Sequence, residues 1–291
     1  MKNIHRGTNM KKVALINDLS GFGKCSLTVA IPVISVMGIQ PCPLPTAVLT
    51  GQTGFEEYYC DDFTDRMDFF TEYWEKMGES FAGIYSGYLA SSRQIEKVNH
   101  FLEHFRGNDT FYLADPVMGD NGKQYQMFSD ELLHGMKKLT LRADVITPNL
   151  TELCLLADEN YDVLVSHSDS SDYLGRIQSI CEELIAKASV PQTVIVTGII
   201  TEENNEMSVT NLAVSKEECK SVKTLYTGMS FSGTGDLFAS AMFGYLIKGV
   251  SIQEAMDKTS YFLQDAIREA TIENIPRNQG IPFEKYLSRL L

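Results

Sequence analysis

The stretch that decides the fold is Ser232-Gly233-Thr234-Gly235-Asp236, which leads directly into the apolar segment 237–247. Gly233 and Gly235 have no Cβ, so the backbone here can turn sharply and expose its N–H groups. Because the apolar segment is typical of a buried helix, we expect those N–H groups at a helix N-terminus, where anions bind. Asp236 would then be placed to take a proton from a hydroxyl group beside the bound anion. The alternative is that Asp236 only caps the helix.

The chain has the composition of an ordinary globular protein: of its 291 residues, 44% are hydrophobic and 22% are charged. Its 25 Lys and Arg residues against 38 Asp and Glu residues give a net charge of −13. A nucleic-acid-binding protein needs a basic face, so this balance argues against a nucleic-acid partner. It does not exclude a nucleotide, because local N–H groups and a metal ion can offset the charge of a triphosphate.

The sequence also bears on location. No stretch reaches the roughly 18 apolar residues of a membrane span, so we expect no membrane partner. Residues 1–9 are polar, lack the apolar centre of a secretion signal, and are expected to form a disordered extension. The six cysteines are scattered and form no CxxC pair. This argues against a zinc site or a disulfide framework and favours a reducing cytoplasm.

Short apolar runs alternate with longer helical patterns along the chain. Strands are expected at 13–17, 82–85, 110–114, 144–146 and 192–197, and 208–214 has the period of a more exposed antiparallel strand. This alternation favours an α/β fold of three layers, with a mainly parallel central sheet between helices. No linker divides the sequence, so we expect one domain over residues 10–291. In such sheets, ligands bind at the carboxyl ends of the strands.

Two stretches carry structural predictions only. Phe63, Met67, Phe70, Trp74 and Met77 recur at helical spacing and predict an amphipathic helix that packs its apolar face in the core. The prolines within 41–45 exclude a central helix or a fully paired strand there, and they predict an edge or connecting stretch.

Asp115-Pro116-Val117-Met118-Gly119-Asp120 follows the expected strand 110–114. Pro116 favours extended backbone at Asp115, so this carboxylate is expected at the strand end, with Asp120 returning across a turn. Two carboxylates in one loop suit a hard cation such as Mg²⁺. The alternative is a turn in which Asp and Gly serve the backbone geometry alone.

Thr147-Pro148-Asn149-Leu150-Thr151-Glu152 comes after another expected strand and opens a helix. Asn149 or Thr151 can cap this helix, and Glu152 can complete the capping arrangement. Glu152 can equally face the crevice and order a water molecule on a metal ion. The two roles do not exclude each other.

The first glycine-bearing turn is Asp18-Leu19-Ser20-Gly21-Phe22-Gly23-Lys24. It is not a Walker P-loop, because Asp18 stands where the first glycine is required and Cys25 follows Lys24 in place of Ser or Thr. It is also a poor dinucleotide fingerprint, because no acidic residue lies between Asp18 and Glu56. What remains is a strand-end loop whose Asp18 and Ser20 are available to a polar small molecule.

The order of these elements resembles that of the ribokinase-like superfamily, from about residue 13 to the C-terminus. Within it, the chain is most similar to the pyridoxal (pyridoxine, pyridoxamine) kinases. Residues 115–120 with Gly122 and Tyr125 match the DPVxGDxGxxY region of that family, and Ser86-Gly87-Tyr88 matches its (T/S)GY.

This resemblance implies an ATP-dependent kinase that acts on the 5′-hydroxymethyl group of a B6 vitamer. Asp236 would be the base that deprotonates the substrate, and Gly233, Thr234 and Gly235 would form the anion hole for the transferred phosphate. The other implied site residues are Asp120 and Glu152 for Mg²⁺, Asp115, Asn149, Thr197 and Thr234 for ATP, and Thr53, Tyr88, Asp18 and Ser20 for the substrate.

The first loop departs from the pattern of pyridoxal kinases. Residues 17–21, Asn-Asp-Leu-Ser-Gly, are closer to the Asp-x-Ser-Gly run of hydroxymethylpyrimidine kinases. A kinase of thiamine synthesis, or one enzyme with both activities, is therefore an alternative. A protein that senses a vitamer without catalysis is a further alternative, which the presence of Asp236 together with Asp120 and Glu152 disfavours.

Three expectations complete the sequence-based hypothesis. Residues 43–59, with Thr53, Phe55, Tyr58 and Tyr59, are the expected cover that excludes water from the transferring phosphate. By analogy with the resembled family we expect a homodimer. Whether a monovalent cation assists Mg²⁺ stays open.

Overall fold

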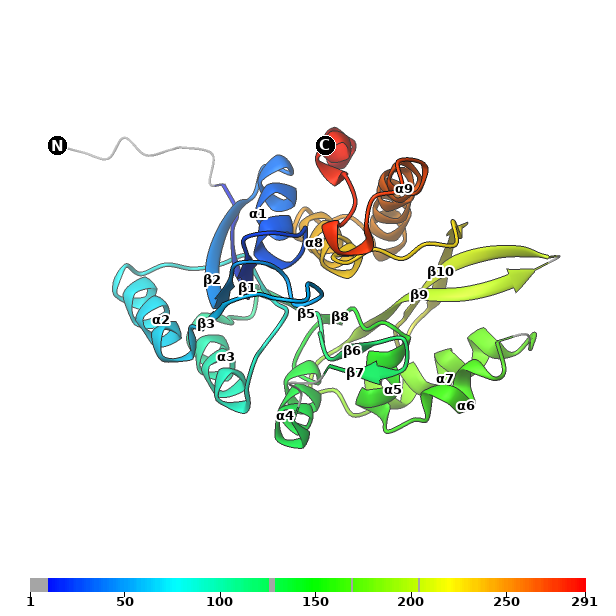
Figure 1. Cartoon of the computed structure of the whole chain (residues 1–291). Coiled ribbons are helices and arrows are strands. Elements are labelled where there is room, and N and C mark those ends of the chain that lie inside the picture. Colours follow the sequence, from blue (N-terminus) through cyan, green and yellow to red (C-terminus); the bar gives the residue numbers. More distant parts are fainter. Residues whose placement is uncertain (1–9, 126–128, 169, 204) are drawn as a thin grey trace.

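The computed structural model describes residues 10–125, 129–168, 170–203 and 205–291, so the expected extension at 1–9 lies outside the described residues. Within these ranges a nine-stranded sheet runs through the molecule (Figure 1). Across the sheet the strands are β11 (Cys219–Leu225), β10 (Glu206–Val214), β9 (Thr193–Glu203), β8 (Val145–Ile146), β5 (Phe111–Ala114), β4 (Gly83–Ser86), β1 (Lys12–Ser20), β2 (Gln40–Leu49) and β3 (Cys60–Asp62). A separate small sheet pairs β6 (Gly119–Asp120) with β7 (Lys123–Gln124).

The strands from β2 to β9 across this sheet all run parallel. Antiparallel pairing is confined to the two margins, where β3 joins β2 and where β10 joins β9 and β11. The predicted α/β fold with a mainly parallel central sheet is therefore confirmed.

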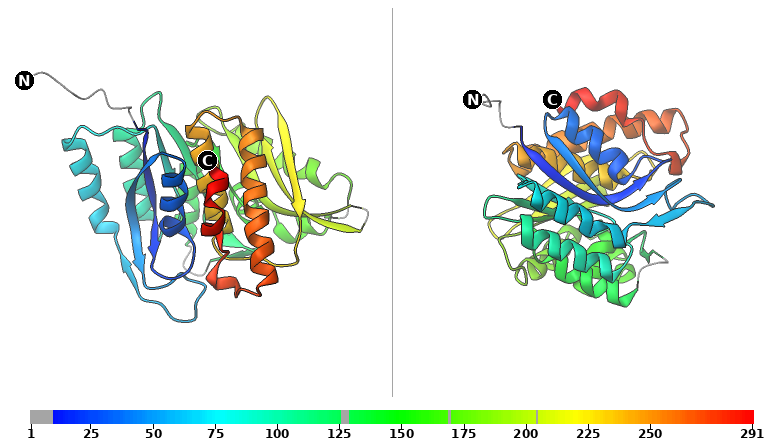
Figure 2. Two further views of the ribbon diagram at one scale, coloured as in Figure 1. Left: turned by 90° about the horizontal axis from the view of Figure 1, so that it is seen from above. Right: turned by 90° about the vertical axis from the view of Figure 1, so that its left-hand side faces the viewer.

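Helices cover both faces of the sheet, as the views in Figures 1 and 2 show. One face carries α1 (Ser26–Val36), α8 (Thr234–Ile247), α9 (Ile252–Ile272) and the C-terminal 3₁₀ segment η3 (Phe283–Leu290). The other face carries α2 (Met67–Lys76), α3 (Ser92–Phe105), α4 (Asp130–Thr140), α5 (Leu150–Ala157) and α7 (Tyr173–Ile185), with the short α6 (Tyr161–Val165) beside them. Two further 3₁₀ turns are η1 (Thr64–Arg66) and η2 (Arg277–Gln279).

Successive side chains of each strand point to opposite faces of the sheet, which explains why both faces are covered by helices. In β1, Val13 and Leu15 pack with α1 and α8, whereas Ala14 and Ile16 pack on the opposite face. Because the central strands are apolar on both sides, a parallel sheet of this kind is stable only when both faces are covered.

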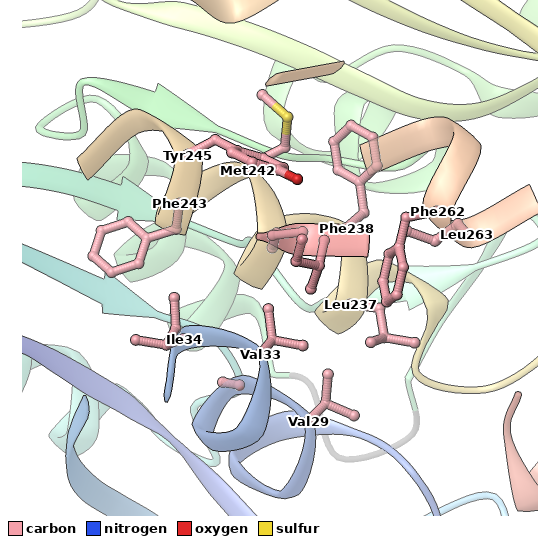
Figure 3. Packing of buried hydrophobic residues seen from close by; sticks show 14 of the residues in the cluster. Val29, Val33, Ile34, Leu237, Phe238, Met242, Phe243, Tyr245, Phe262 and Leu263 are labelled. Carbon is pink, nitrogen blue, oxygen red and sulfur yellow. The ribbon is translucent and has the colours of Figure 1, made fainter. Parts of the chain in front are cut away.

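Helix α8 is the most deeply buried helix of the first face. Its residues from Leu237 to Tyr245 are all buried, because α8 packs against the sheet, α1 and α9 at once. Figure 3 shows Leu237, Phe238 and Met242 among the apolar side chains of α1 and α9. This burial fixes the position of the helix N-terminus, where the predicted anion hole begins.

The structure confirms the expected strands and extends some of them. Strand β9 continues to Glu203, beyond the predicted 192–197, and β11 was not predicted. The helix expected from the aromatic stripe is η1 followed by α2, and Phe70 and Trp74 pack on the core. Met77 is the exception, since its side chain is 54% exposed. The helix ends at Lys76, one residue before it.

The proline-containing stretch forms the first half of β2. It pairs with β1, and the Gln40 N–H donates to the Lys11 carbonyl oxygen at 2.9 Å. Strand β3 pairs only with Ala47–Leu49, so the other side of the stretch has no strand partner in the described residues. The prolines, which lack an N–H, are tolerated at such an edge.

None of the helices in the described ranges combines the length and the apolar composition that spanning a lipid bilayer requires.

Candidate active site

The strand order places the predicted site residues at one edge of the sheet. After β1 the chain adds β2 on one side and later β4 on the other, so the order of the strands reverses between β1 and β4. The crevice at such a reversal, outside the carboxyl ends of the strands, is where ligands bind in open α/β sheets. The ends of β1, β4, β5 and β8 and the loops after them contain the predicted residues 18–20, 86–88, 115–120 and 147–152.

The glycine turn before α8 lies against the first loop. Gly233 is the N-cap of α8 and has a φ of +81°, a left-handed conformation that favours glycine. A Cβ at this position would overlap the carbonyl oxygen of Lys24 and lie 2.8 Å from its carbonyl carbon. Only glycine therefore lets the two loops, more than 200 residues apart in sequence, approach so closely.

The first turn of α8 has the features expected of an anion hole. No side chain caps its N-terminus within the described part of the chain. The Thr234 hydroxyl donates to the Phe231 carbonyl oxygen at 3.0 Å, and Gly235 is exposed with open space where a Cβ would be. N–H groups in such a turn are available to an anion.

Asp236 lies in the same turn, beside the end of β1. Its Oδ1 accepts a hydrogen bond from the Asn17 side-chain amide at 3.4 Å, and the Ser26 backbone N–H also binds the carboxylate. Burial and the nearby charge of Asp18 raise the pKa of Asp236 to about 7. A carboxyl group with a pKa close to neutral is suited to general base catalysis.

Asp18 and Ser20 lie at the carboxyl end of β1. Both are buried, and the Asp18 carboxylate accepts hydrogen bonds from the hydroxyls of Ser20 and Ser26. Burial raises the pKa of Asp18. In the ligand-free protein the two predicted substrate-binding side chains thus bind to each other, and their role toward a substrate stays a prediction.

Asn17 is a site residue that the sequence analysis missed. Its side-chain oxygen accepts from the backbone N–H groups of Asp18 at 3.0 Å and Tyr88 at 2.8 Å, while its amide nitrogen donates to Asp236. A Cβ on Gly87 would overlap this amide, which explains the glycine of the Ser-Gly-Tyr motif. A polar residue directly after the apolar run 13–16, within β1, was the available signal.

Ser26 was also missed. It joins Asp18 through its hydroxyl and Asp236 through its backbone N–H, and its φ of +53° is unusual for a residue other than glycine. Strained backbone of this kind is often found at functional sites. Nothing in the sequence marks Ser26, because serine is common at helix starts.

Asp115 lies at the end of β5, as predicted. It is buried, and its Oδ1 accepts from the Thr147 hydroxyl at 3.0 Å. Burial and the charge of Asp236 raise the pKa of Asp115 to about 8.

Glu152 and Asn149 form a complete capping box at the start of α5. The Glu152 carboxylate accepts from the backbone N–H groups of Asn149 at 2.8 Å and Met118 at 3.1 Å. Burial, followed by the charge of Asp115, raises the pKa of Glu152 well above its usual value. The predicted capping role is therefore present, and the carboxylate also ties α5 to the 115–120 loop.

Asn149 and Thr197, both predicted to bind ATP, lie side by side. They form an isolated parallel bridge, and the Thr197 N–H donates to the Pro148 carbonyl oxygen at 2.9 Å. The Asn149 amide nitrogen donates to the Gly119 carbonyl oxygen at 2.8 Å. The loops after β5 and β8 and strand β9 are thereby connected.

Asp120 is the more accessible of the two predicted metal ligands. Its carboxylate accepts from the backbone and side chain of Asn121, and Oδ2 forms an ion pair with Arg277 at 3.0 Å. No group of three or more His, Cys, Asp or Glu residues in the described ranges could hold a metal ion by itself. Mg²⁺ does not require one, since it retains water and binds one or two carboxylates together with substrate phosphates. The accessible carboxylate of Asp120 fits the role of such a ligand. Glu152 is buried and binds the backbone of the 115–120 loop.

Thr53 and Tyr88 are the other two residues predicted to bind the substrate. Thr53 is exposed in the loop after β2, and Tyr88 is half-buried. Burial and the charge of Asp18 raise the pKa of Tyr88 to about 12, with smaller effects from Cys60 and Tyr58.

The expected cover is joined to a segment that the sequence analysis did not single out. Gln52 donates to the carbonyl oxygen of Asn278 at 3.1 Å, and Asn278 donates to that of Gly54. The Ser232 N–H binds the carbonyl oxygen of Arg277 at 3.1 Å. Turn η2 thus connects the expected cover, at residues 52–54, to the turn before α8. No motif in the sequence marks η2.

Comparisons with known proteins bear on the class of protein. Residues 66–280 match the family described as phosphomethylpyrimidine kinase. A curated relative, the pyridoxine/pyridoxal/pyridoxamine kinase of Bordetella avium, is 22% identical over 254 residues, which are 84% of this chain and 81% of that protein. A solved structure from Bacteroides thetaiotaomicron, described as a "putative phosphomethylpyrimidine kinase" in a crystal form with pyridoxal, is 39% identical with a TM-score of 0.89, and covers 97% of this chain and 96% of its own.

A more distant structure shows the fold alone. The pyridoxal kinase of Leishmania donovani, solved with ADP and pyridoxamine, has a TM-score of 0.78 at 19% identity and covers 96% of this chain and 95% of its own. The fold is therefore that of the ribokinase-like pyridoxal kinases. This chain belongs to the phosphomethylpyrimidine kinase family.

Replacing Asp115 by Asn should make the protein more stable at alkaline pH. The native pKa of about 8 lies above the usual value of 3.8, so the unfolded chain releases this proton at a lower pH than the native protein does. The free energy of unfolding contributed by Asp115 therefore falls as pH rises from about 4 to about 8. Asn keeps the acceptor for Thr147 and removes the ionisation. At about 1.36 kcal/mol per pKa unit, we expect the gain at pH 8 to exceed the gain at pH 5 by a few kcal/mol.

Urea unfolding of the wild type and Asp115→Asn at pH 5 and pH 8 measures this difference. Asp109→Asn, at an exposed position, is the matched control. An equal effect of Asp115→Asn at both pH values would contradict the assignment.

Proposed function

We propose that this protein catalyses the ATP-dependent phosphorylation of the 5′-hydroxymethyl group of a B6 vitamer: pyridoxal, pyridoxamine or pyridoxine. The observation that carries the proposal is the position of Asp236, whose pKa is raised to about 7, in the uncapped first turn of α8. A base and an anion-binding turn thus meet at one point. The relatives and solved structures described above support the class of substrate.

In this reaction Asp236 takes the proton of the substrate hydroxyl as the hydroxyl oxygen attacks the terminal phosphorus of ATP. The bond from that phosphorus to the bridging oxygen breaks, and ADP leaves. The transition state spreads negative charge over the moving phosphoryl oxygens, so positioning and electrostatics supply most of the catalysis. The N–H groups of the turn at Gly233, Thr234 and Gly235 stabilise that charge, and one such donor is typically worth about 3–4 kcal/mol. Asn17 orients the Asp236 carboxylate.

Mg²⁺ would supply further charge neutralisation between the phosphates. Asp120 offers the accessible carboxylate oxygen, and Glu152 holds the 115–120 loop in place. Asp115, Asn149, Thr197 and Thr234 line the proposed path of the ATP phosphates. Asp18, Ser20, Thr53 and Tyr88 surround the proposed place of the vitamin ring, and residues 43–59 cover it.

The second candidate function is phosphorylation of hydroxymethylpyrimidine, either alone or beside the B6 vitamers. Membership of the phosphomethylpyrimidine kinase family and the Asp-x-Ser-Gly run at residues 18–21 favour it. The same Asp236 and anion turn would serve both substrates, so the ring contacts decide between them. One domain over residues 10–291, a homodimeric assembly, a cytoplasmic location and a monovalent cation beside Mg²⁺ also belong to the proposal.

Substrate preference is tested by ADP release in the presence of ATP and Mg²⁺, with each of the three B6 vitamers and with hydroxymethylpyrimidine. We expect kcat/KM to be highest for a B6 vitamer. A higher kcat/KM for hydroxymethylpyrimidine would contradict the B6 assignment and identify the protein as a kinase of thiamine synthesis. Binding of a vitamer without ADP release in any combination would favour the sensing alternative.

Asp236→Ala should lose most turnover while it keeps the fold and the affinity for ATP. General base assistance is worth about 10²- to 10⁴-fold, so kcat should fall by that factor. Because Asp236 accepts a proton only when ionised, kcat/KM of the wild type should rise about tenfold per pH unit below the pKa of about 7 and level off above it.

The pH profile of kcat/KM, with circular dichroism of the variant, measures both effects. The slope should be absent in Asp236→Ala. A variant with near-normal kcat would remove Asp236 from the mechanism.

A further inference from the structure

The Arg277 side chain spans the two loops that meet at the proposed phosphate path. Its Nη2 forms the ion pair with Asp120 at 3.0 Å, and its Nε donates to the Ser230 hydroxyl at 3.3 Å. Its carbonyl oxygen accepts from the Ser232 N–H. The guanidinium group is therefore held between the loop after β5 and the turn that leads into α8.

The charges around this guanidinium are strongly unbalanced. The carboxyl groups of the site are those of Asp18, Asp115, Asp120, Glu152 and Asp236. Within the part of the chain that the structure describes, Arg277 is the one basic side chain that forms an ion pair with any of them. Lys24, the other basic residue near the crevice, pairs with Glu284 at 2.7 Å instead. Arg277 is therefore a cation already held at the carboxylates of the site, where it can meet the phosphates of a nucleotide.

Stability does not explain the ion pair. The side chains of Arg277 and Asp120 are 50% and 39% exposed, and ion pairs with this exposure contribute little to the free energy of unfolding. For the same reason the pair can open at little cost. The ion pair engages Asp120, the carboxylate of the site most suited to Mg²⁺. It can therefore serve the function of the site.

We infer that Arg277 is a positioning residue that holds Asp120 in the absence of metal and passes to the nucleotide phosphates when Mg²⁺ binds that carboxylate. The exchange replaces one cation on Asp120 by another and leaves the guanidinium free to bind phosphate oxygens, for which its planar set of donors is suited. Turn η2 keeps the guanidinium group near the site. The Arg277 carbonyl oxygen accepts from the Ser232 N–H, and the carbonyl oxygen of the next residue, Asn278, accepts from Gln52. This inference rests on the proposed function, since it concerns the same ATP site.

Arg277→Gln tests the exchange through binding, without any catalytic readout. Electron paramagnetic resonance of Mn²⁺ measures divalent metal binding to the nucleotide-free protein, and calorimetry measures binding of ADP with Mg²⁺ and, in a parallel titration, with EDTA. With its competitor removed, Asp120 should bind Mn²⁺ about two- to fivefold more tightly. The loss of a charged hydrogen-bond donor should weaken ADP binding in the presence of Mg²⁺ by about tenfold or more. Binding of metal-free ADP should change much less, because Arg277 then stays on Asp120.

Three variants separate this role from a structural one. Arg277→Lys keeps the positive charge and should restore weak Mn²⁺ binding, whereas a purely structural role would leave Lys and Gln equally affected. Asp120→Asn should abolish the gain in Mn²⁺ affinity when combined with Arg277→Gln. Arg93→Gln, which breaks an exposed ion pair with Asp65, is the control and should change neither measurement.

Unchanged Mn²⁺ and ADP affinities in Arg277→Gln would overturn the inference, as would an equal effect of the Lys and Gln variants. These outcomes are distinct from a failure of the proposed function. In that case Arg277→Gln would show the expected changes in Mn²⁺ and ADP affinity, but the wild type would release no ADP with any vitamer or pyrimidine.

Discussion

The contact on which the rest of the site depends is the close approach of Gly233 to the Lys24 carbonyl group. A side chain at position 233 would occupy the same space as the carbonyl oxygen, so the loop after β1 and the turn before α8 could not meet. Their meeting places Asp236 beside Asn17, Asp18 and Ser26. Burial of α8 between the sheet, α1 and α9 supports the approach from behind, since the helix cannot shift without disturbing all three.

The same convergence has an electrostatic cost. Asp18, Asp115, Glu152 and Asp236 are brought to one edge of the sheet, and burial raises the pKa of each of them. The neighbouring carboxyl groups raise the values of Asp115, Glu152 and Asp236 further. Carboxyl groups that are reluctant to ionise lower the stability of the native protein at neutral pH. Such clusters are typical of sites at which function, and not stability, selects the residues. A cation on Asp120 offsets part of this charge, whether it is the guanidinium of Arg277 or the metal ion.

The sequence alone predicted the layers, the main strands and the edge of the sheet at which the candidate residues gather, because these follow from local patterns. Apolar runs such as 13–17 are buried wherever they lie in a parallel sheet, and Asp-Pro or Thr-Pro-Asn at a strand end projects polar groups at its edge. The residues that were missed depend on distant partners. Asn17 acts on Asp236, 219 positions away, and Arg277 on Asp120, 157 positions away. Met77 was placed in the core because the helical period continues through it, but the helix ends at Lys76 and leaves its side chain exposed.

The central claim is that Asp236 and the first turn of α8 act together on one hydroxyl group and one phosphate. A crystal structure of the protein with Mg²⁺, a non-hydrolysable ATP analogue and pyridoxal tests it most directly. The account predicts that the substrate hydroxyl oxygen lies about 2.6–3.2 Å from a carboxylate oxygen of Asp236, with the terminal phosphate on the N–H groups of residues 233–235. A hydroxyl group bound elsewhere, with the Asp236 side chain remote from both ligands, would contradict it.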